Sequence, residues 1–271
     1  MHLFDILKII DTTDIVNLKK NRFFSEITSN SKNINKNSIF IYDSNSKSKL
    51  KYVKLAIENN TPAVITNKKL SLSNTAQFIV KDIFKEKEKL LKSLYKNLPS
   101  ESIAITGTNG KSSVAWYVSK IFRNLDLKYQ YVGTLGYYKY GKKIKDLSLT
   151  TPAYEELYNY GTSNKKTKQY FIFEASSHAL DQNRIGKFPV NIAAITNISN
   201  DHLDYHKTMS NYLSSKMKLF FNHLSINGFA IINSRIKNIE KYKKKLIKNK
   251  IKIVNFGKNH VFFKKNTKEL E

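Results

Sequence analysis

Seven residues have the types and spacing to hold a phosphate group. The stretch GTNGKSS (107–113) follows the β-branched run SIAITG (102–107) and precedes SSVAWYVSKIFRNL (112–125), which has the pattern of a helix. Its glycines permit tight backbone geometry, so that successive N–H groups can face an anion at a helix N-terminus. A lysine would reach the terminal phosphates and a serine could ligate Mg²⁺. The predicted nucleotide-binding residues are Gly107, Thr108, Asn109, Gly110, Lys111, Ser112 and Ser113.

This phosphate-loop pattern is shortened. The usual form has a glycine five positions before Gly110, and Ile105 stands there instead. An ordinary turn with a capping serine would also fit these letters. The position between a buried strand and a helix favours the nucleotide interpretation.

A second stretch combines histidines, aspartates and a lysine. NDHLDYHKTMSNYLSSK (200–216) is compatible with a metal site, with proton transfer, or with a turn before a helix that starts near Tyr212. Taken alone, Lys216 is one surface lysine among many, and a buried acid such as Glu174 can be purely structural. The chain has no cysteine, which excludes disulfides, a thiol nucleophile and cysteine-ligated metals.

The elements that must position these residues form two groups. Before Pro99, the runs 38–43 and 62–67 predict strands, and 49–60 and 85–98 predict helices. After it, continuously apolar runs of strand length alternate with helical segments, which predicts a mostly parallel sheet with helices on both faces. We therefore predict an α/β protein with a small N-terminal domain (1–98) and a phosphate-loop domain (99–271). The strands predicted in the second domain are 102–107, 170–176, 191–199, 228–233 and 251–257.

The net charge of +26 raises the possibility of a nucleic-acid-binding protein. Nearly all of the positive charge is lysine, whereas arginine is favoured for bidentate phosphate and base recognition. The lysines are scattered, and the run 241–250 reads as the solvated face of a helix. We therefore expect a solvated surface and no specific nucleic-acid partner. No apolar run is long enough to span a bilayer, so we expect a cytoplasmic protein with no membrane partner.

Several motifs, in order after the phosphate loop, resemble the Mur ligases, and within them the enzymes that add the third residue of the peptidoglycan stem peptide. The resemblance covers nearly all of the chain. The strong matches are FEASSHALDQNRI (173–185), TNISNDHLDYH (196–206) and YLSSKMKLF (212–220), and the supporting ones are VGTLGYY (132–138), LTTP (149–152) and ITSNSKNINKNSIFI (27–41).

The resemblance implies an ADP-forming ligase that uses ATP and Mg²⁺. Its substrates would be UDP-MurNAc-L-Ala-D-Glu and a diamino acid, either diaminopimelate or lysine, joined through an acyl phosphate. The domain 1–98 would bind the UDP-MurNAc portion, and the protein would be a monomer.

The same resemblance assigns roles to particular residues. Lys111 would contact the phosphates, and Lys216 would be carbamylated. Ser112, Glu174, His202 and the Lys216 carbamate would hold magnesium. Lys111, Glu174, His202 and Lys216 are the expected catalytic set. The expected substrate-binding residues are Ser31, Thr150, Thr151, Ser176, Gln182 and Arg184.

Two features depart from the family. The Asp-Ser-Arg of the uridine-nucleotide segment is Asn30-Ser31-Lys32 here, and Ser234 and Arg235 stand where acidic residues are usual. Family members also carry a C-terminal amino-acid-binding domain, and we expect it to be absent here because the pattern stops within the central domain. We therefore expect a fragment or degenerate copy that binds nucleotide weakly and does not ligate. The alternatives are another Mur-type ligase (pentapeptide-forming or folylpolyglutamate synthase-like) and a non-catalytic remnant.

Overall fold

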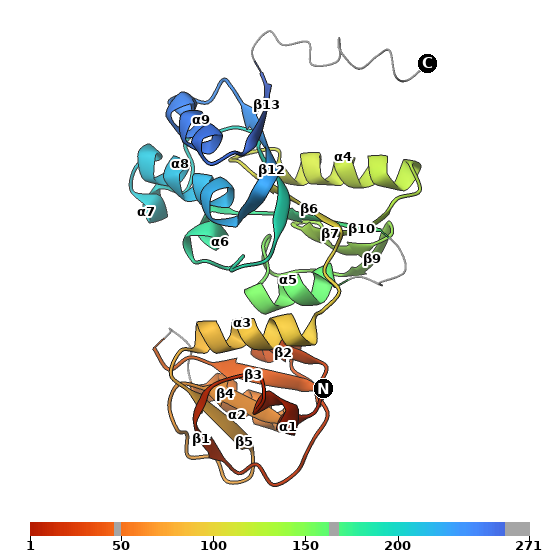
Figure 1. The fold of residues 1–271 in the computed structure, drawn as a ribbon, viewed down its shortest axis with the longest axis vertical. Coiled ribbons are helices and arrows are strands. Elements are labelled where there is room, and N and C mark those ends of the chain that lie inside the picture. The colour runs from red at the N-terminus through yellow and green to blue at the C-terminus, as the bar shows by residue number, and fades with distance from the viewer. Residues whose placement is uncertain (46–49, 163–167, 258–271) are drawn as a thin grey trace. The chain divides into compact units, whose positions relative to one another are not determined.

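The computed structural model describes residues 1–45, 50–162 and 168–257. The chain divides into two compact units (Figure 1). The first contains Met1–Leu98 together with Glu155–Thr162, and the second contains Pro99–Tyr154 and the chain from Ser163 onward. A helix from the middle of the sequence therefore belongs to the first unit.

The first unit is built on a five-stranded sheet of order β1-β5-β4-β3-β2. Strands β2 to β5 are parallel, and β1 is antiparallel to β5. The middle strands are buried along their whole length, as expected of a parallel sheet covered on both faces. The strands are β1 (Thr12–Val16), β2 (Glu26–Thr28), β3 (Ser38–Tyr42), β4 (Ala63–Thr66) and β5 (Ala76–Val80).

Apolar faces of the helices close the core of the first unit. In α2, Val53 and Ala56 pack with Phe40 and Val64 of the sheet. Asp82 caps α3 by accepting a hydrogen bond from the backbone N–H of Lys85. The helices are α1 (Leu3–Ile6), η1 (Ser31–Asn33), α2 (Leu50–Glu58), α3 (Ile83–Leu94) and α5 (Tyr154–Gly161).

The second unit is built on an eight-stranded sheet of order β13-β12-β11-β6-β10-β7-β8-β9. The strands from β13 to β7 in this order are parallel, and β8 and β9 extend the edge as antiparallel strands. The strands are β6 (Glu101–Thr106), β7 (Lys128–Gly133), β8 (Gly136–Lys139), β9 (Lys142–Lys145), β10 (Gln169–Glu174), β11 (Val190–Ile195), β12 (Leu224–Asn233) and β13 (Lys252–Phe256).

Both faces of this sheet are buried. Ala115 and Trp116 of α4 pack against the face that carries Tyr131 and Ile172. Alternate residues point to the opposite face, where the Phe188 ring packs against the rings of two β10 phenylalanines. The helices are α4 (Lys111–Asn124), α6 (Ser177–Asp181), α7 (Leu203–His206), α8 (Met209–Lys218), the π-helix η2 (Leu219–His223) and α9 (Ile239–Lys248).

The predicted mixed α/β class with a mostly parallel sheet is confirmed, but some helix boundaries were wrong. The 85–98 helix is α3, which begins at Ile83 because Asp82 caps it, and ends at Leu94. The helix expected near Tyr212 begins at Met209, where Thr208 provides the cap. Lys49, the first residue of the predicted 49–60 helix, lies outside the described residues. Among those residues, no helix has both the length and the apolar character that crossing a bilayer would require.

Candidate active site

Two glycines shape the turn between β6 and α4. Gly107 has a φ of +140°, and a Cβ there would lie 1.9 Å from Oγ1 of Thr196. Gly110 is the N-cap of α4 and has a φ of +82°. Both positions therefore require glycine, one for the close approach of β11 and both for a backbone conformation that L-residues rarely adopt. The turn delivers the chain to the N-terminus of a 14-residue helix, where an anion is favoured.

The residues that follow β11 brace this loop. Asn197 accepts hydrogen bonds from the N–H of Thr108 through its carbonyl (2.9 Å) and from the N–H of Asn109 through Oδ1 (3.0 Å). The Thr108 hydroxyl lies 3.2 Å from the Tyr212 hydroxyl on α8. The loop is thus held from the neighbouring strand and from α8, and sequence reasoning gave no such role to Asn197 or Tyr212.

Two lysines converge on one carbonyl of the loop. Nζ of Lys111 donates to the Gly107 oxygen at 3.0 Å and Nζ of Lys216 donates to the same oxygen at 2.8 Å. Lys216 is only 1% exposed, and its Nζ lies 4.4 Å from the centre of the Tyr212 ring. Burial, reinforced by the nearby Lys111 ammonium, lowers the pKa of Lys216 to about 7, although Asp201 opposes the change. Burial also lowers the pKa of Lys111. This lowered pKa is the condition that the predicted carbamylation of Lys216 requires, because CO₂ adds to the neutral amine.

Glu174, at the end of β10, is fully buried and faces this loop. Its Oε2 accepts a hydrogen bond from the Ser112 hydroxyl (2.8 Å), and its Oε1 accepts from the Tyr131 hydroxyl (2.7 Å) and the Thr134 N–H (2.9 Å). Burial, followed by the bond to Glu174, raises the pKa of the Tyr131 hydroxyl, which therefore stays a donor. A Cβ at Gly133 would lie 2.1 Å from Oε1.

The threonines of the LTTP motif join the same site. The Thr151 hydroxyl donates to the Glu174 carbonyl (2.8 Å) and accepts from the Ser176 N–H (2.9 Å). The Arg184 guanidinium donates to the Thr151 carbonyl at 2.7 Å. Thr150 is linked through the Thr134 hydroxyl, 3.1 Å away. Four of the expected substrate-binding residues therefore gather around Glu174.

The two remaining substrate candidates lie elsewhere. Gln182 is the C-cap of α6 and its side chain is exposed to solvent. Ser31 belongs to the first unit, where it is buried and begins η1 after the Asn30 cap.

The histidines of the stretch 200–216 form an aromatic cluster with His178. The ring centres of His178 and His202 are 4.8 Å apart, those of His178 and His206 are 5.6 Å apart, and Tyr205 and Tyr212 pack against them. His202 has a φ of +51°, and its side chain is 47% exposed. Burial lowers the pKa values of His178 and His206. His202 is thus the member most open to a ligand, whereas His178 was missed as a site residue.

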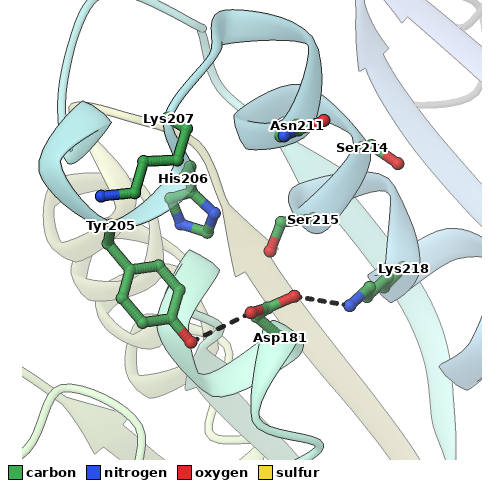
Figure 2. Close-up of a pocket in the computed structure, with 8 residues that line it drawn as sticks. All are labelled: Asp181, Tyr205, His206, Lys207, Asn211, Ser214, Ser215 and Lys218. Carbon is green, nitrogen blue, oxygen red and sulfur yellow. Dashed lines mark hydrogen bonds and ion pairs between the residues drawn. The ribbon is translucent and has the colours of Figure 1, made fainter.

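A surface pocket of about 380 Å³ lies beside this cluster (Figure 2). Asp181 accepts hydrogen bonds from the Tyr205 hydroxyl and the Lys218 ammonium there. At 100° per residue, the α8 positions that line it centre on the side of the helix opposite Lys216. The pocket is therefore separate from the phosphate-loop site. Those α8 positions are Asn211, Ser214, Ser215 and Lys218.

The donors near the loop fit magnesium better than a transition metal. Within the described ranges, no three histidine, aspartate or glutamate side chains are arranged to hold a metal by themselves. The Ser112 hydroxyl and the Glu174 carboxylate are hard oxygen donors held 2.8 Å apart. Mg²⁺ characteristically takes one or two protein oxygens and completes its shell with phosphate and water, so this donor set fits it.

Comparison with known proteins identifies the class to which this fold and site belong. A family model described as the Mur ligase middle domain matches residues 105–270. The chain therefore belongs to the Mur ligase family.

Two similar curated proteins share the name UDP-N-acetylmuramoyl-L-alanyl-D-glutamate–2,6-diaminopimelate ligase. The chain is 36% identical to that of Rickettsia prowazekii, with 89% of this chain and 51% of the relative covered. It is 39% identical to that of Rickettsia bellii, with 86% and 49% covered. The chain spans about half the length of these relatives.

Solved structures support the fold. One named as the same ligase superposes with a TM-score of 0.67 at 24% identity, covering 94% of this chain and 52% of that one. The MurF ligase of Thermotoga maritima, solved in complex with ADP, has a TM-score of 0.59 at 17% identity, with 87% and 51% covered.

Proposed function

We propose that this chain provides the uridine-nucleotide and ATP sites of a ligase that adds diaminopimelate to UDP-MurNAc-L-Ala-D-Glu. The names of the curated relatives support this substrate pair. The first unit would bind the uridine nucleotide at the segment that contains Ser31. The second would bind ATP at residues 107–113 and the dipeptide at Thr150, Thr151, Ser176 and Arg184.

The observation that carries the proposal is the burial of Lys216 against the phosphate loop. A buried lysine with a pKa of about 7 is partly neutral at physiological pH. Its nitrogen can form an N–C bond with CO₂, and the proton released goes to solvent. The product is a carbamate with one negative charge. This change would convert a cation that repels a metal into an anionic oxygen donor at the phosphate loop.

Each polar group of the site has a defined task in the proposed reaction. Lys111 exchanges its bonds to loop carbonyls for bonds to the nucleotide phosphates, and the N-terminus of α4 adds its partial positive charge. Arg184, which donates to the Thr151 carbonyl, is suited to a substrate carboxylate because its planar guanidinium can donate two parallel N–H bonds. Bound magnesium would neutralise charge on the transferring phosphoryl group.

The reaction then needs no protein nucleophile. The γ-carboxylate of the D-glutamyl residue attacks the γ-phosphorus of ATP, and ADP leaves. The neutral amine of the diamino acid attacks the acyl phosphate, phosphate leaves, and the proton released from the nitrogen goes to solvent. The chain would contribute positioning and charge neutralisation through Lys111, while Ser112 and Glu174 would hold the magnesium ion.

Two measurements on this chain test the proposal. Intact mass in bicarbonate buffer should show a CO₂ adduct that Lys216→Met abolishes and Lys218→Met retains. Calorimetry should show ADP binding that strengthens with Mg²⁺, and Glu174→Gln should remove most of that magnesium dependence. ADP binding that is indifferent to Mg²⁺, together with no adduct, would contradict the proposed site.

A further inference from the structure

Glu155 is a fully buried acid that no step of the proposed reaction uses. Its Oε1 accepts a hydrogen bond from the Ser29 N–H at 2.7 Å, and its Oε2 accepts from the Lys87 ammonium at 3.0 Å. Burial alone would raise the pKa of this carboxyl, but Lys87 and the Ser29 bond outweigh it and hold the pKa below its ordinary value. The side chain is therefore an anion held in one place by two partners from distant parts of the chain.

Further contacts fix α5 along the segment that contains Ser31. The Asn33 side-chain amide donates to the Glu156 carboxylate. The Asn159 side-chain amide donates to Glu26 at 3.3 Å. Together with Glu155, these bonds attach successive turns of α5 to the stretch from β2 to η1. That stretch is the one expected to contact the uridine nucleotide.

The same short piece of chain reaches the second unit. Thr151 lies four positions before Glu155, and its hydroxyl and carbonyl are bound by Glu174, Ser176 and Arg184. Only the three residues 152–154 separate Thr151 from Glu155, and at about 3.5 Å per residue this connection limits how far the two can move apart. A movement of the Ser29–Ser31 segment therefore acts on Thr151 through Glu155.

We propose that Glu155 is a positioning residue that couples the uridine-nucleotide segment to the placement of Thr150 and Thr151. This inference rests on the proposed function. A uridine nucleotide bound near Ser31 would order the Ser29 backbone, and the Glu155 bond would transmit that order to the threonines that grip the dipeptide. Glu155 is placed to supply this link because it is the first residue of the first unit after the chain leaves the second unit at Tyr154.

The test compares Glu155→Gln with Glu156→Gln, a matched change one position along the same helix. Calorimetry gives the dissociation constants of UDP, of UDP-MurNAc-L-Ala-D-Glu and of ADP with Mg²⁺. The dissociation constant of UDP divided by that of UDP-MurNAc-L-Ala-D-Glu measures how much the muramoyl-dipeptide adds to binding. Glu155→Gln should lower this ratio about tenfold, because the Lys87 ammonium loses its buried carboxylate partner and the link to Ser29 is weakened. Its affinities for UDP and ADP should stay unchanged, and Glu156→Gln should keep the ratio.

Hydrogen exchange in the ligand-free chain gives a second readout. Glu155→Gln should speed exchange of the amides at 150–154 about tenfold or more, while the β10 amides exchange as before. If the single variant does not fold, Glu155→Gln with Lys87→Met removes both members of the ion pair and carries the same expectations.

The possible results distinguish a failure of the coupling role of Glu155 from a failure of the proposed dipeptide site. A lower melting temperature with an unchanged affinity ratio and unchanged exchange at 150–154 would assign Glu155 a purely structural role and overturn the inference. If the natural chain bound UDP and UDP-MurNAc-L-Ala-D-Glu equally, the proposed dipeptide site would fail. Exchange at 150–154 would then still decide whether Glu155 couples the two segments.

Discussion

Replacing Lys216 with methionine should stabilise the second unit at neutral and lower pH. Methionine keeps most of the apolar stem and removes the buried ammonium, and the Gly107 carbonyl keeps its bond from Lys111. The pKa of Lys216 is about 7 in the folded chain and 10.5 for an unperturbed lysine. Below about pH 7 both states carry the proton, so the folded state bears the whole cost of the buried charge.

The size of the effect follows from that gap. At about 1.4 kcal/mol per pH unit, the difference between 7 and 10.5 amounts to about 5 kcal/mol. Relaxation and water penetration reduce this upper limit, and the lost hydrogen bond offsets about 1 kcal/mol. We expect Lys216→Met to raise the free energy of unfolding by about 2–4 kcal/mol near pH 6. The advantage should shrink as the pH rises from about 7 towards 10.5, because only the unfolded lysine still binds the proton there.

Urea unfolding followed by tryptophan fluorescence measures this directly. Trp116 is the single tryptophan and lies in α4, where it packs against Tyr131 and Tyr138, so it reports on the second unit. Buffers should be free of bicarbonate, so that the amine stays unmodified. Lys218→Met is the matched control on the same helix, with an expected change within about 1 kcal/mol. A Lys216→Met advantage that is absent near pH 6, or equal near pH 6 and pH 9, would refute the reasoning.

Three other changes have defined consequences. Gly133→Ala places a Cβ 2.1 Å from Oε1 of Glu174 and should cost about 1–3 kcal/mol of unfolding free energy while weakening ADP–Mg²⁺ binding, measured by urea unfolding and calorimetry. Phe188→Ala removes a buried ring that packs on two β10 phenylalanines, and should cost about 3–5 kcal/mol without changing nucleotide affinity once folded. Ser112→Ala leaves the fold intact and should reduce the magnesium dependence of ADP binding in calorimetric titrations. An unchanged magnesium dependence would remove Ser112 from the metal site.

The sequence predicted most of the second sheet because its inner strands are continuous apolar runs. β6 and β10 lie within two residues of their predicted bounds, whereas β11 ends at Ile195, four residues before its predicted end. The strands β7, β8 and β9 were missed, since KYQYVG, GYYK and KKIK carry no continuous apolar run. Local signals also missed α5 as part of the first unit, because its attachment depends on the distant partners Ser29 and Lys87.

The sequence predicted the site residues that lie in a recognisable motif at the end of a strand. It did not predict the residues that bind them from neighbouring strands. The loop and Glu174 could be placed from the rule that ligands gather at the carboxyl ends of parallel strands. Tyr131 and Thr134, which hold the Glu174 carboxylate, could not be assigned, because only the register of β7 beside β10 brings them there. Gly133 was the available signal, since a glycine at a strand end indicates a close approach.

The membership of α5 in the first unit has a consequence for synthesis on the ribosome. Domains generally fold as units while the chain emerges, beginning at the N-terminus. Here the first unit lacks its last helix until residue 162 has left the exit tunnel. Until then Lys87 cannot form its ion pair with Glu155. By then the phosphate loop and β7 have already been made. The two units must therefore mature in an interleaved order, and a pause in translation before residue 155 would leave the nascent first unit open to proteases.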